Sequence, residues 1–217
     1  MLHIIPVITS MLATITKVAV TIGPTIAKYA PMLLEMAGKY LPQIIKTVET
    51  VCTVLNIVSP NERAEDLGAK AMNAEKKPED FDKINDYIDY LRQDVSVDKT
   101  TLSEDPINVT ARQVIGSSLM IKAAGEVLGT ELTLPFIKTV SQLDLDANVI
   151  VEVAKAYSNS ALNLNDFDEY ITDTLSLDES DKHSNALVYA YQKTDSSMTV
   201  EQAEDRVMDL ALPTNSL

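Results

Sequence analysis

The first 58 residues carry their few charged side chains at helical intervals, and this spacing limits what the segment can fold into. Lys17, Lys28 and Lys39 lie eleven residues apart, and Glu35 and Lys46 each lie seven residues beyond one of these lysines. Eleven residues make about three turns of an α-helix, so such side chains return to nearly the same bearing. On a helical wheel of about 100° per residue, all charges of the segment fall within about 80°. The resulting polar stripe consists of Lys17, Lys28, Glu35, Lys39, Lys46 and Glu49.

Four prolines interrupt the same segment near one edge of the polar stripe. A proline inside a helix removes a hydrogen-bond donor and bends the helix axis. On a solvent-exposed face, water can bond to the carbonyl that has lost its donor. We expect breaks at Gly23-Pro24 and at Leu41-Pro42, which divide the segment into helices 2–22, 24–40 and 42–58. The sequence therefore predicts a long, kinked, apolar helical arm with a narrow polar stripe and a very wide apolar face.

The composition favours an all-α fold. The chain of 217 residues is 46% hydrophobic but only 5% aromatic, with six glycines and no tryptophan, which is atypical of β-sandwiches and barrels. The net charge is −14. Residues 1–58 contribute +2, from four lysines and two glutamates, so the remainder carries −16. Such an acidic chain argues against a nucleic-acid partner, which would need clustered lysine and arginine.

The composition changes at "SPNERAEDLGAKAMNAEKKPED" (59–80). We divide the chain into the apolar arm (1–58), a polar linker or short exposed helix (59–77) and an acidic helical bundle (78–217). Apolar residues at 3–4 spacing predict an amphipathic helix that begins at Pro78. Asp105-Pro106 is a typical helix start, and the helix that follows to Leu128 is rich in small residues that allow close helix packing.

Capping signals recur in the last third of the chain. Four short stretches combine an apolar residue, a polar cap, an apolar residue and an acid or amide; they begin at Leu143, Leu162, Leu175 and Met198. Two of them fit the capping box, with Ser176 followed by Glu179 and Thr199 followed by Gln202. These signals predict about four short helices over 144–212. The segment "NVIVEVAKAY" is β-branched enough for a strand, although its flanks favour a helix.

The residues that could perform catalysis are few. The only imidazoles are His3 and His183, and we expect His183 on a solvated first turn. Cys52 lies among apolar residues and is expected to be an inert filler. Asp144, Asp146 and Asn148 resemble the start of a calcium loop, but the glycine and glutamate that such a loop requires are absent. The sequence thus predicts no catalytic, cofactor-binding or metal site, and the protein is not expected to be an enzyme.

The wide apolar face of the arm must be covered, and three surroundings remain open. The leading hypothesis is a non-catalytic helical interaction protein that self-associates or binds a protein partner through residues 1–58. The alternative is a membrane-inserting effector, pore-forming or cell-entry protein that delivers 1–58 into lipid. The second alternative is a monomeric helical domain with 1–58 as its central core.

The apolar start "MLHIIPVITSMLATIT" has the composition of a targeting signal or of a membrane span. It has no basic n-region, so we expect no cleavable signal peptide and a protein that is cytoplasmic or exported without a classical signal. The longest uncharged run, 1–16, is shorter than the ~20 residues of a typical span. Membrane association is therefore kept as the competing hypothesis.

Overall fold

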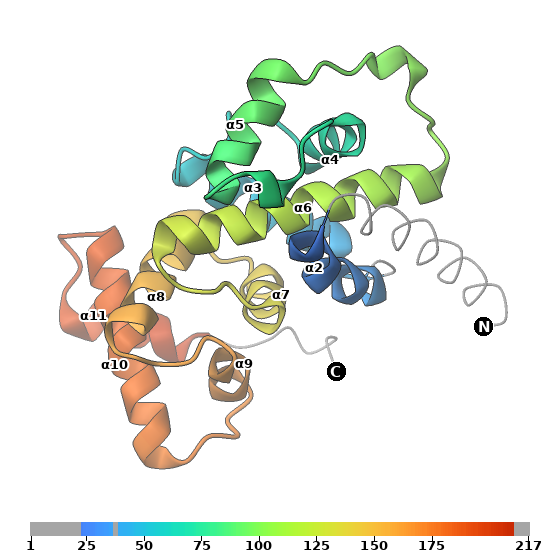
Figure 1. The fold of residues 1–217 in the computed structure, drawn as a ribbon. Coiled ribbons are helices and arrows are strands. Elements are labelled where there is room, and N and C mark those ends of the chain that lie inside the picture. The colour runs from blue at the N-terminus through green and yellow to red at the C-terminus, as the bar shows by residue number, and fades with distance from the viewer. Residues whose placement is uncertain (1–22, 37–38, 211–217) are drawn as a thin grey trace, which may run out of the picture. The chain divides into compact units, whose positions relative to one another are not determined.

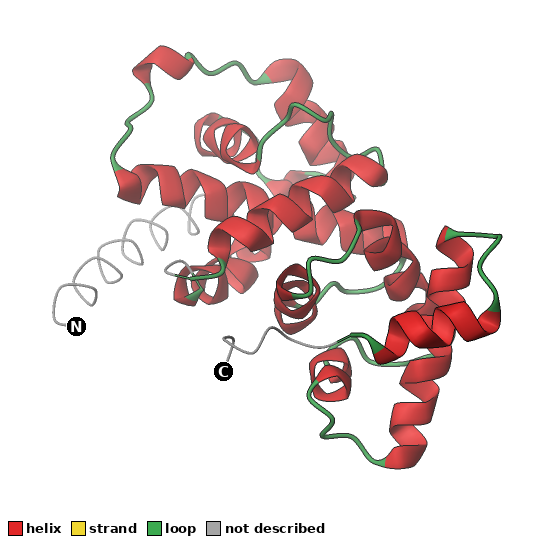
Figure 2. Cartoon of the chain, turned by 180° about the vertical axis from the view of Figure 1, so that it is seen from behind, coloured by secondary structure: helices red, strands yellow, loops and turns green. Residues whose placement is uncertain are grey.

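The computed structural model describes residues 23–36 and 39–210, and over these residues the chain is helical with no strand (Figure 2). The predicted all-α fold is confirmed. The chain forms two compact units, an N-terminal unit (1–126) and a C-terminal unit (127–217). The predicted division into segments 1–58, 59–77 and 78–217 stays a prediction.

The helices of the N-terminal unit follow the predicted order (Figure 1). They are α2 (Pro24–Glu35), α3 (Leu41–Val54), α4 (Ala64–Asn73), α5 (Ile84–Asp94) and α6 (Pro106–Leu128), which ends just beyond the unit boundary, with 3₁₀ turns at Pro78–Asp80 and Lys99–Thr101. Helices α2 and α3 begin at the two expected breaks, and Gly23 before α2 has a φ of 103°. The predicted helix 2–22 lies outside the described residues, so the continuous kinked arm stays a prediction.

The apolar face of α2 and α3 is buried by the chain itself. Its buried residues are Tyr29, Ala30, Leu33, Leu34, Leu41, Ile44, Val48, Val51 and Cys52. The Cys52 thiol donates a hydrogen bond to the Met120 carbonyl of α6 at 3.4 Å, which places this face of α3 against α6. Burying a leucine or isoleucine side chain stabilises a fold by roughly 1.5–3 kcal/mol. The part of the predicted arm within 24–58 therefore forms hydrophobic core.

Helices α4 and α6 cross with their backbones in direct contact. A methyl group at Gly68 would overlap the backbone of Arg112, and one at Gly116 would overlap the backbone of Ala64. The segment 59–77, expected to be a linker or an exposed helix, thus contains a helix that packs closely through its glycine. The small residues noted in α6 serve this close approach at Gly116.

A buried arginine links the same two helices. Arg112 is 5% exposed, and its guanidinium donates to Glu65 Oε1 at 3.0 Å from Nε and 2.7 Å from Nη2. Nη2 also donates to the Ser103 carbonyl at 2.9 Å. The pair therefore connects α4, α6 and the loop before α6, and it places a charge in the interior where its partners must satisfy it.

Two helices of the N-terminal unit receive their N-terminal caps from distant glutamates. Glu49 of α3 accepts hydrogen bonds from the Ala64 amide at 2.8 Å and from Arg63 at 3.0 Å, at the start of α4. Glu126 of α6 accepts from the Ile84 amide at 3.0 Å, at the start of α5. The predicted helix start at Pro78 was too early, because Pro78–Asp80 forms a separate 3₁₀ turn and α5 begins at Ile84.

The C-terminal unit contains the four short helices expected over 144–212. They are α8 (Ala147–Asn159), α9 (Asp166–Ile171), α10 (Leu177–Thr194) and α11 (Val200–Met208), preceded by α7 (Leu134–Gln142), which was not predicted. Helix α10 packs against α8 and α11, and α7 packs against α9. The capping boxes at Ser176 and Thr199 are confirmed. The β-branched "NVIVEVAKAY" lies within α8, whose cap Asp146 accepts a hydrogen bond from the Asn148 amide.

Aromatic side chains form the core of this unit. Phe136 of α7, Tyr157 of α8 and Phe167 of α9 are fully buried. Phe167 meets Phe136 and Tyr157 edge-on, with ring centroids 5.3 and 6.1 Å apart. Edge-to-face pairs of this kind contribute about 0.5–1.5 kcal/mol beyond their burial. These contacts hold α7, α8 and α9 together.

Three helices of this unit end in the same way, without glycine. Asp144, Ala161 and Asp173 have φ values of 49°, 53° and 56°. In each case the next amide bonds to the carbonyl five residues earlier, from Leu145 to Val140, Leu162 to Tyr157 and Thr174 to Glu169. This is the Schellman arrangement, in which the left-handed residue is usually glycine. The polar residue at Asp144 therefore ends α7, and Asp146 begins α8.

Ala161→Gly is expected to stabilise the protein by about 1 kcal/mol, because the left-handed conformation is strained for alanine and not for glycine. The reverse change, Gly129→Ala, serves as the matched control, since Gly129 has a φ of 66° and an added Cβ would meet no other atom within 4 Å. It should destabilise by a similar amount. Thermal and urea unfolding measure both variants, and an Ala161→Gly protein that is less stable than wild type would contradict the expectation.

Candidate interaction site

The predicted polar stripe is only partly within the described residues. Lys17 lies outside them, whereas Lys28, Glu35, Lys39 and Lys46 are exposed on α2, α3 and the turn between them. Lys39 Nζ lies 4.8 Å from the ring centroid of Tyr40. Glu49 is half-buried, and its carboxylate caps α4. The helical spacing of the stripe did not predict this structural role. In the described chain the stripe is thus the solvent face of α2 and α3.

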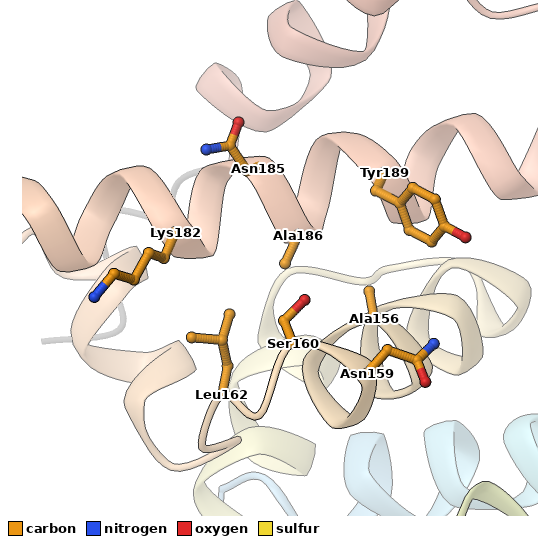
Figure 3. A pocket seen from close by; sticks show the side chains of 8 residues that line it. All are labelled: Ala156, Asn159, Ser160, Leu162, Lys182, Asn185, Ala186 and Tyr189. Carbon is orange, nitrogen blue, oxygen red and sulfur yellow. The ribbon is translucent and has the colours of Figure 1, made fainter.

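Two hollows lie between α8 and α10 in the C-terminal unit, and we call this surface the groove; the first is an apolar hollow of about 480 Å³. Figure 3 shows the two sides, with α10 above and the end of α8 below. The lining residues are Ala156, Asn159, Ser160, Leu162, Lys182, Asn185, Ala186 and Tyr189. The small side chains of Ala156 and Ala186 are buried and leave space between the helices, and Leu162 points across that space toward α10.

Tyr189 stands at one end of the apolar hollow and is 49% exposed. Lys193, one turn further along α10, places Nζ 5.1 Å from the centroid of the Tyr189 ring. Beyond this pair lies a second hollow of about 370 Å³, lined by Asp146, Asn148, Val149, Glu152, Lys193 and Thr194. We call it the acidic hollow. It uses the N-terminal half of α8 and the C-terminal end of α10, so both hollows belong to the same antiparallel helix pair.

Charge is concentrated on this unit. Residues 127–217 contain five basic and sixteen acidic residues, a net charge of −11 out of −14 for the whole chain. The structure records no side-chain hydrogen bond or ion pair for Asn159, Ser160 or Lys182 within the described residues. The groove thus combines apolar surface, polar groups open to a ligand and a negative surrounding field.

His183 is buried, so the expected solvated position was wrong. It is 3% exposed, and its Nδ1 lies 2.9 Å from the Tyr157 hydroxyl. The Tyr170 ring stacks on the imidazole at 5.9 Å and 13°. His183 lies on the same face of α10 as the buried Ala186, Leu187 and Ala190, and this 3–4 spacing was the signal for burial. His183 therefore serves the core of the unit.

Burial lowers the pKa of His183, and the nearby carboxylates of Asp166 and Glu179 oppose this only in part. Burial also raises the pKa of the Tyr157 hydroxyl, so both groups of the pair are neutral, and the imidazole tautomer decides which of them donates. Protonation of His183 would place a charge in the interior beside Tyr157 and Tyr170. The buried pair is therefore stable while the imidazole stays neutral.

The free energy of unfolding is expected to fall between pH 7 and pH 5. The unfolded chain has a histidine of ordinary pKa, about 6.5, which binds a proton before the folded one does, so acid favours unfolding. In His183→Gln this fall should be clearly smaller, whereas His3→Gln should retain it. Urea unfolding at pH 7, 6 and 5 measures the slope. Equal slopes in wild type and His183→Gln would contradict the role of the imidazole.

The other candidate residues do not form a reactive or metal-binding constellation in the described chain. Cys52 is fully buried, and burial raises the pKa of its thiol, in keeping with the expected inert filler. Among the residues that the structure describes, no group of histidine, cysteine, aspartate and glutamate could hold a metal ion. Asp144 and Asp146, noted for their likeness to a calcium loop, instead end α7 and begin α8.

Within the described ranges no helix has the length and the apolar composition that crossing a bilayer requires. No family model, curated protein or solved structure matches this chain.

Proposed function

We propose that this chain is a non-catalytic, all-helical interaction protein, and that its C-terminal unit binds a segment of a protein partner in the groove between α8 and α10. The observation that carries the proposal is the apolar hollow beside the half-exposed Tyr189. Tyrosine is enriched among the residues that dominate protein interfaces, and such residues lie next to pockets that exclude water. Asn159 and Ser160 add hydrogen-bonding groups at the rim.

The groove is a better candidate than the described part of the apolar arm. Most of the described apolar side chains of α2 and α3 are buried, although Met32 is 40% exposed, so within 24–58 they fit the alternative in which the arm is core. By contrast, Tyr189 and the hollow next to it face solvent. Residues 1–22 lie outside the described part of the chain, and self-association or membrane insertion through them stays a prediction.

Panning a random peptide library against the full-length chain tests the proposal. We expect enriched peptides whose affinity, measured by fluorescence anisotropy, falls at least tenfold in Tyr189→Ala, because truncating a central interface tyrosine costs about 2 kcal/mol. Met208→Ala is the matched control, since Met208 is 74% exposed on α11 and does not line the groove. It should change affinity less than twofold.

Two results would count against the proposal. One is the absence of any enriched peptide, and the other is a set of peptides that bind Tyr189→Ala as tightly as wild type. Circular dichroism of each variant tests that the helices are retained, which is expected because Tyr189 is half-exposed and Met208 largely exposed.

A further inference from the structure

We infer that the segment bound in the groove is basic with an apolar anchor: it places an apolar side chain in the apolar hollow and an arginine or lysine in the acidic hollow, in competition with Lys193. This inference rests on the proposed function and adds the chemistry of the partner. It uses the two hollows together, and the residues between them set their spacing.

The apolar hollow accounts for the anchor. Its floor consists of two buried alanines, Ala156 and Ala186, which leave room between α8 and α10 that a longer side chain from a partner can fill. Leu162 and Tyr189 form the ends of this space in Figure 3. The stem of Lys182 can lie along an apolar anchor while its ammonium group stays in water. Asn159 and Ser160 can bind the backbone of the segment.

The acidic hollow accounts for the basic residue. Asp146 and Glu152 both line it, and Lys193 is the basic residue on its wall. Lys155 pairs with Glu152 at 2.7 Å, but both side chains are partly exposed and such a surface pair contributes little. The structure records no ion pair for Lys193 in the described chain, and its ammonium group lies near the Tyr189 ring. Lys193 and Lys155 balance the two carboxylates, and Asp146 Oδ1 also accepts two hydrogen bonds from Asn148. A cation from the partner therefore binds there by replacing these lysines, and the net charge of the unit attracts it.

The distance between the two hollows sets the distance between the apolar anchor and the basic residue in the partner segment. Glu152 lies on α8 and Ser160 is its C-terminal cap eight residues later, which at 1.5 Å per residue is about 12 Å along the groove. An extended segment covers this distance in about four residues, and a helical one in about eight. The arginine and the apolar anchor should therefore lie about four residues apart in an extended partner or eight apart in a helical one.

Fluorescein-labelled 12-residue peptides test the inference on the full-length chain. Each carries one leucine and one arginine, four or eight residues apart, and matched peptides replace the arginine by glutamine or glutamate. We expect the arginine peptides to bind most tightly and the glutamate peptides most weakly, with the difference reduced at high salt. A Tyr189-dependent peptide that binds equally with arginine, glutamine or glutamate would overturn the inference but leave the proposed function standing.

Two variants of the chain separate the acidic hollow from the charge of the whole unit. Lys193→Ala should tighten binding of the arginine peptide by about three- to fivefold, because it removes the competing cation, and Glu152→Gln should weaken it by a similar factor. Asp209→Asn, an equal change in net charge at the exposed end of α11, should change affinity less than twofold. Weaker binding in Lys193→Ala, or equal losses in Glu152→Gln and Asp209→Asn, would overturn the inference. If none of the peptides binds the wild-type chain more tightly than Tyr189→Ala, the proposed function itself is overturned.

Discussion

Gly116→Ala and Gly68→Ala are each expected to lower the free energy of unfolding by about 3 kcal/mol. At either position the new methyl group would overlap backbone atoms of the partner helix, which cannot rotate away as a side chain can. The α4–α6 crossing must then open, and overpacking of this kind costs about 1–3 kcal/mol or more. In an open helix the same substitution would be stabilising by about 1 kcal/mol, so the sign of the effect reports the contact.

Calorimetry measures this prediction as a fall in the melting temperature of about 10 °C. Asp86→Ala, at an exposed position of α5, is the control and should shift the free energy by less than about 0.5 kcal/mol. The double variant Gly68→Ala/Gly116→Ala should cost less than the sum of the single changes, because a crossing that has opened for one methyl group has already made room for the other. A neutral or stabilising Gly116→Ala would show that the helices do not touch there.

The second large effect is expected from Glu65→Ala, which should cost about 3 kcal/mol. It removes the carboxylate that accepts two hydrogen bonds from Arg112, and the guanidinium is left buried with only the Ser103 carbonyl as partner. An uncompensated buried charge is the costly result of breaking such a pair. Removing the arginine instead, in Arg112→Met, should cost only about 1 kcal/mol, because the Glu65 side chain is 34% exposed and water can solvate it.

The difference in cost between Glu65→Ala and Arg112→Met is what the experiment measures. Urea unfolding of the double variant Glu65→Ala/Arg112→Met should recover most of the stability lost in Glu65→Ala, since the charge that lacked a partner has been removed. Equal losses in the two single variants, or a double variant as unstable as Glu65→Ala, would show that packing rather than the buried charge determines the cost.

The sequence predicted those parts of the fold whose signals are local. The helix starts at Pro106, Ser176 and Thr199 depend on residues within one turn, and each was predicted. The missed helix α7 also had a local signal, because Thr133 accepts a hydrogen bond from the Phe136 amide and Pro135 lies in the first turn. Local chemistry was therefore sufficient for most helix boundaries in the C-terminal unit.

The remaining features depend on which helices meet. Burial of His183 requires α8 and α9 to cover one face of α10, and the capping role of Glu49 requires α4 to begin beside α3. The groove likewise exists only because α8 and α10 pack antiparallel and the small side chains of Ala156 and Ala186 leave space between them. A single sequence shows that these residues are apolar, acidic or basic, but it does not show their neighbours. For this reason the polar stripe was predicted as an interaction feature and the groove was not.

The distant caps of α4 and α5 have a consequence for how the N-terminal unit assembles. Helix α4 has ten residues and α5 has eleven, lengths at which an isolated helix is marginal in water. The carboxylates that receive their first amides come from α3 and α6, so neither short helix has its full set of hydrogen bonds before those longer helices are in place. Nucleation should therefore begin in α3 and α6, with α4 and α5 condensing onto them late and cooperatively.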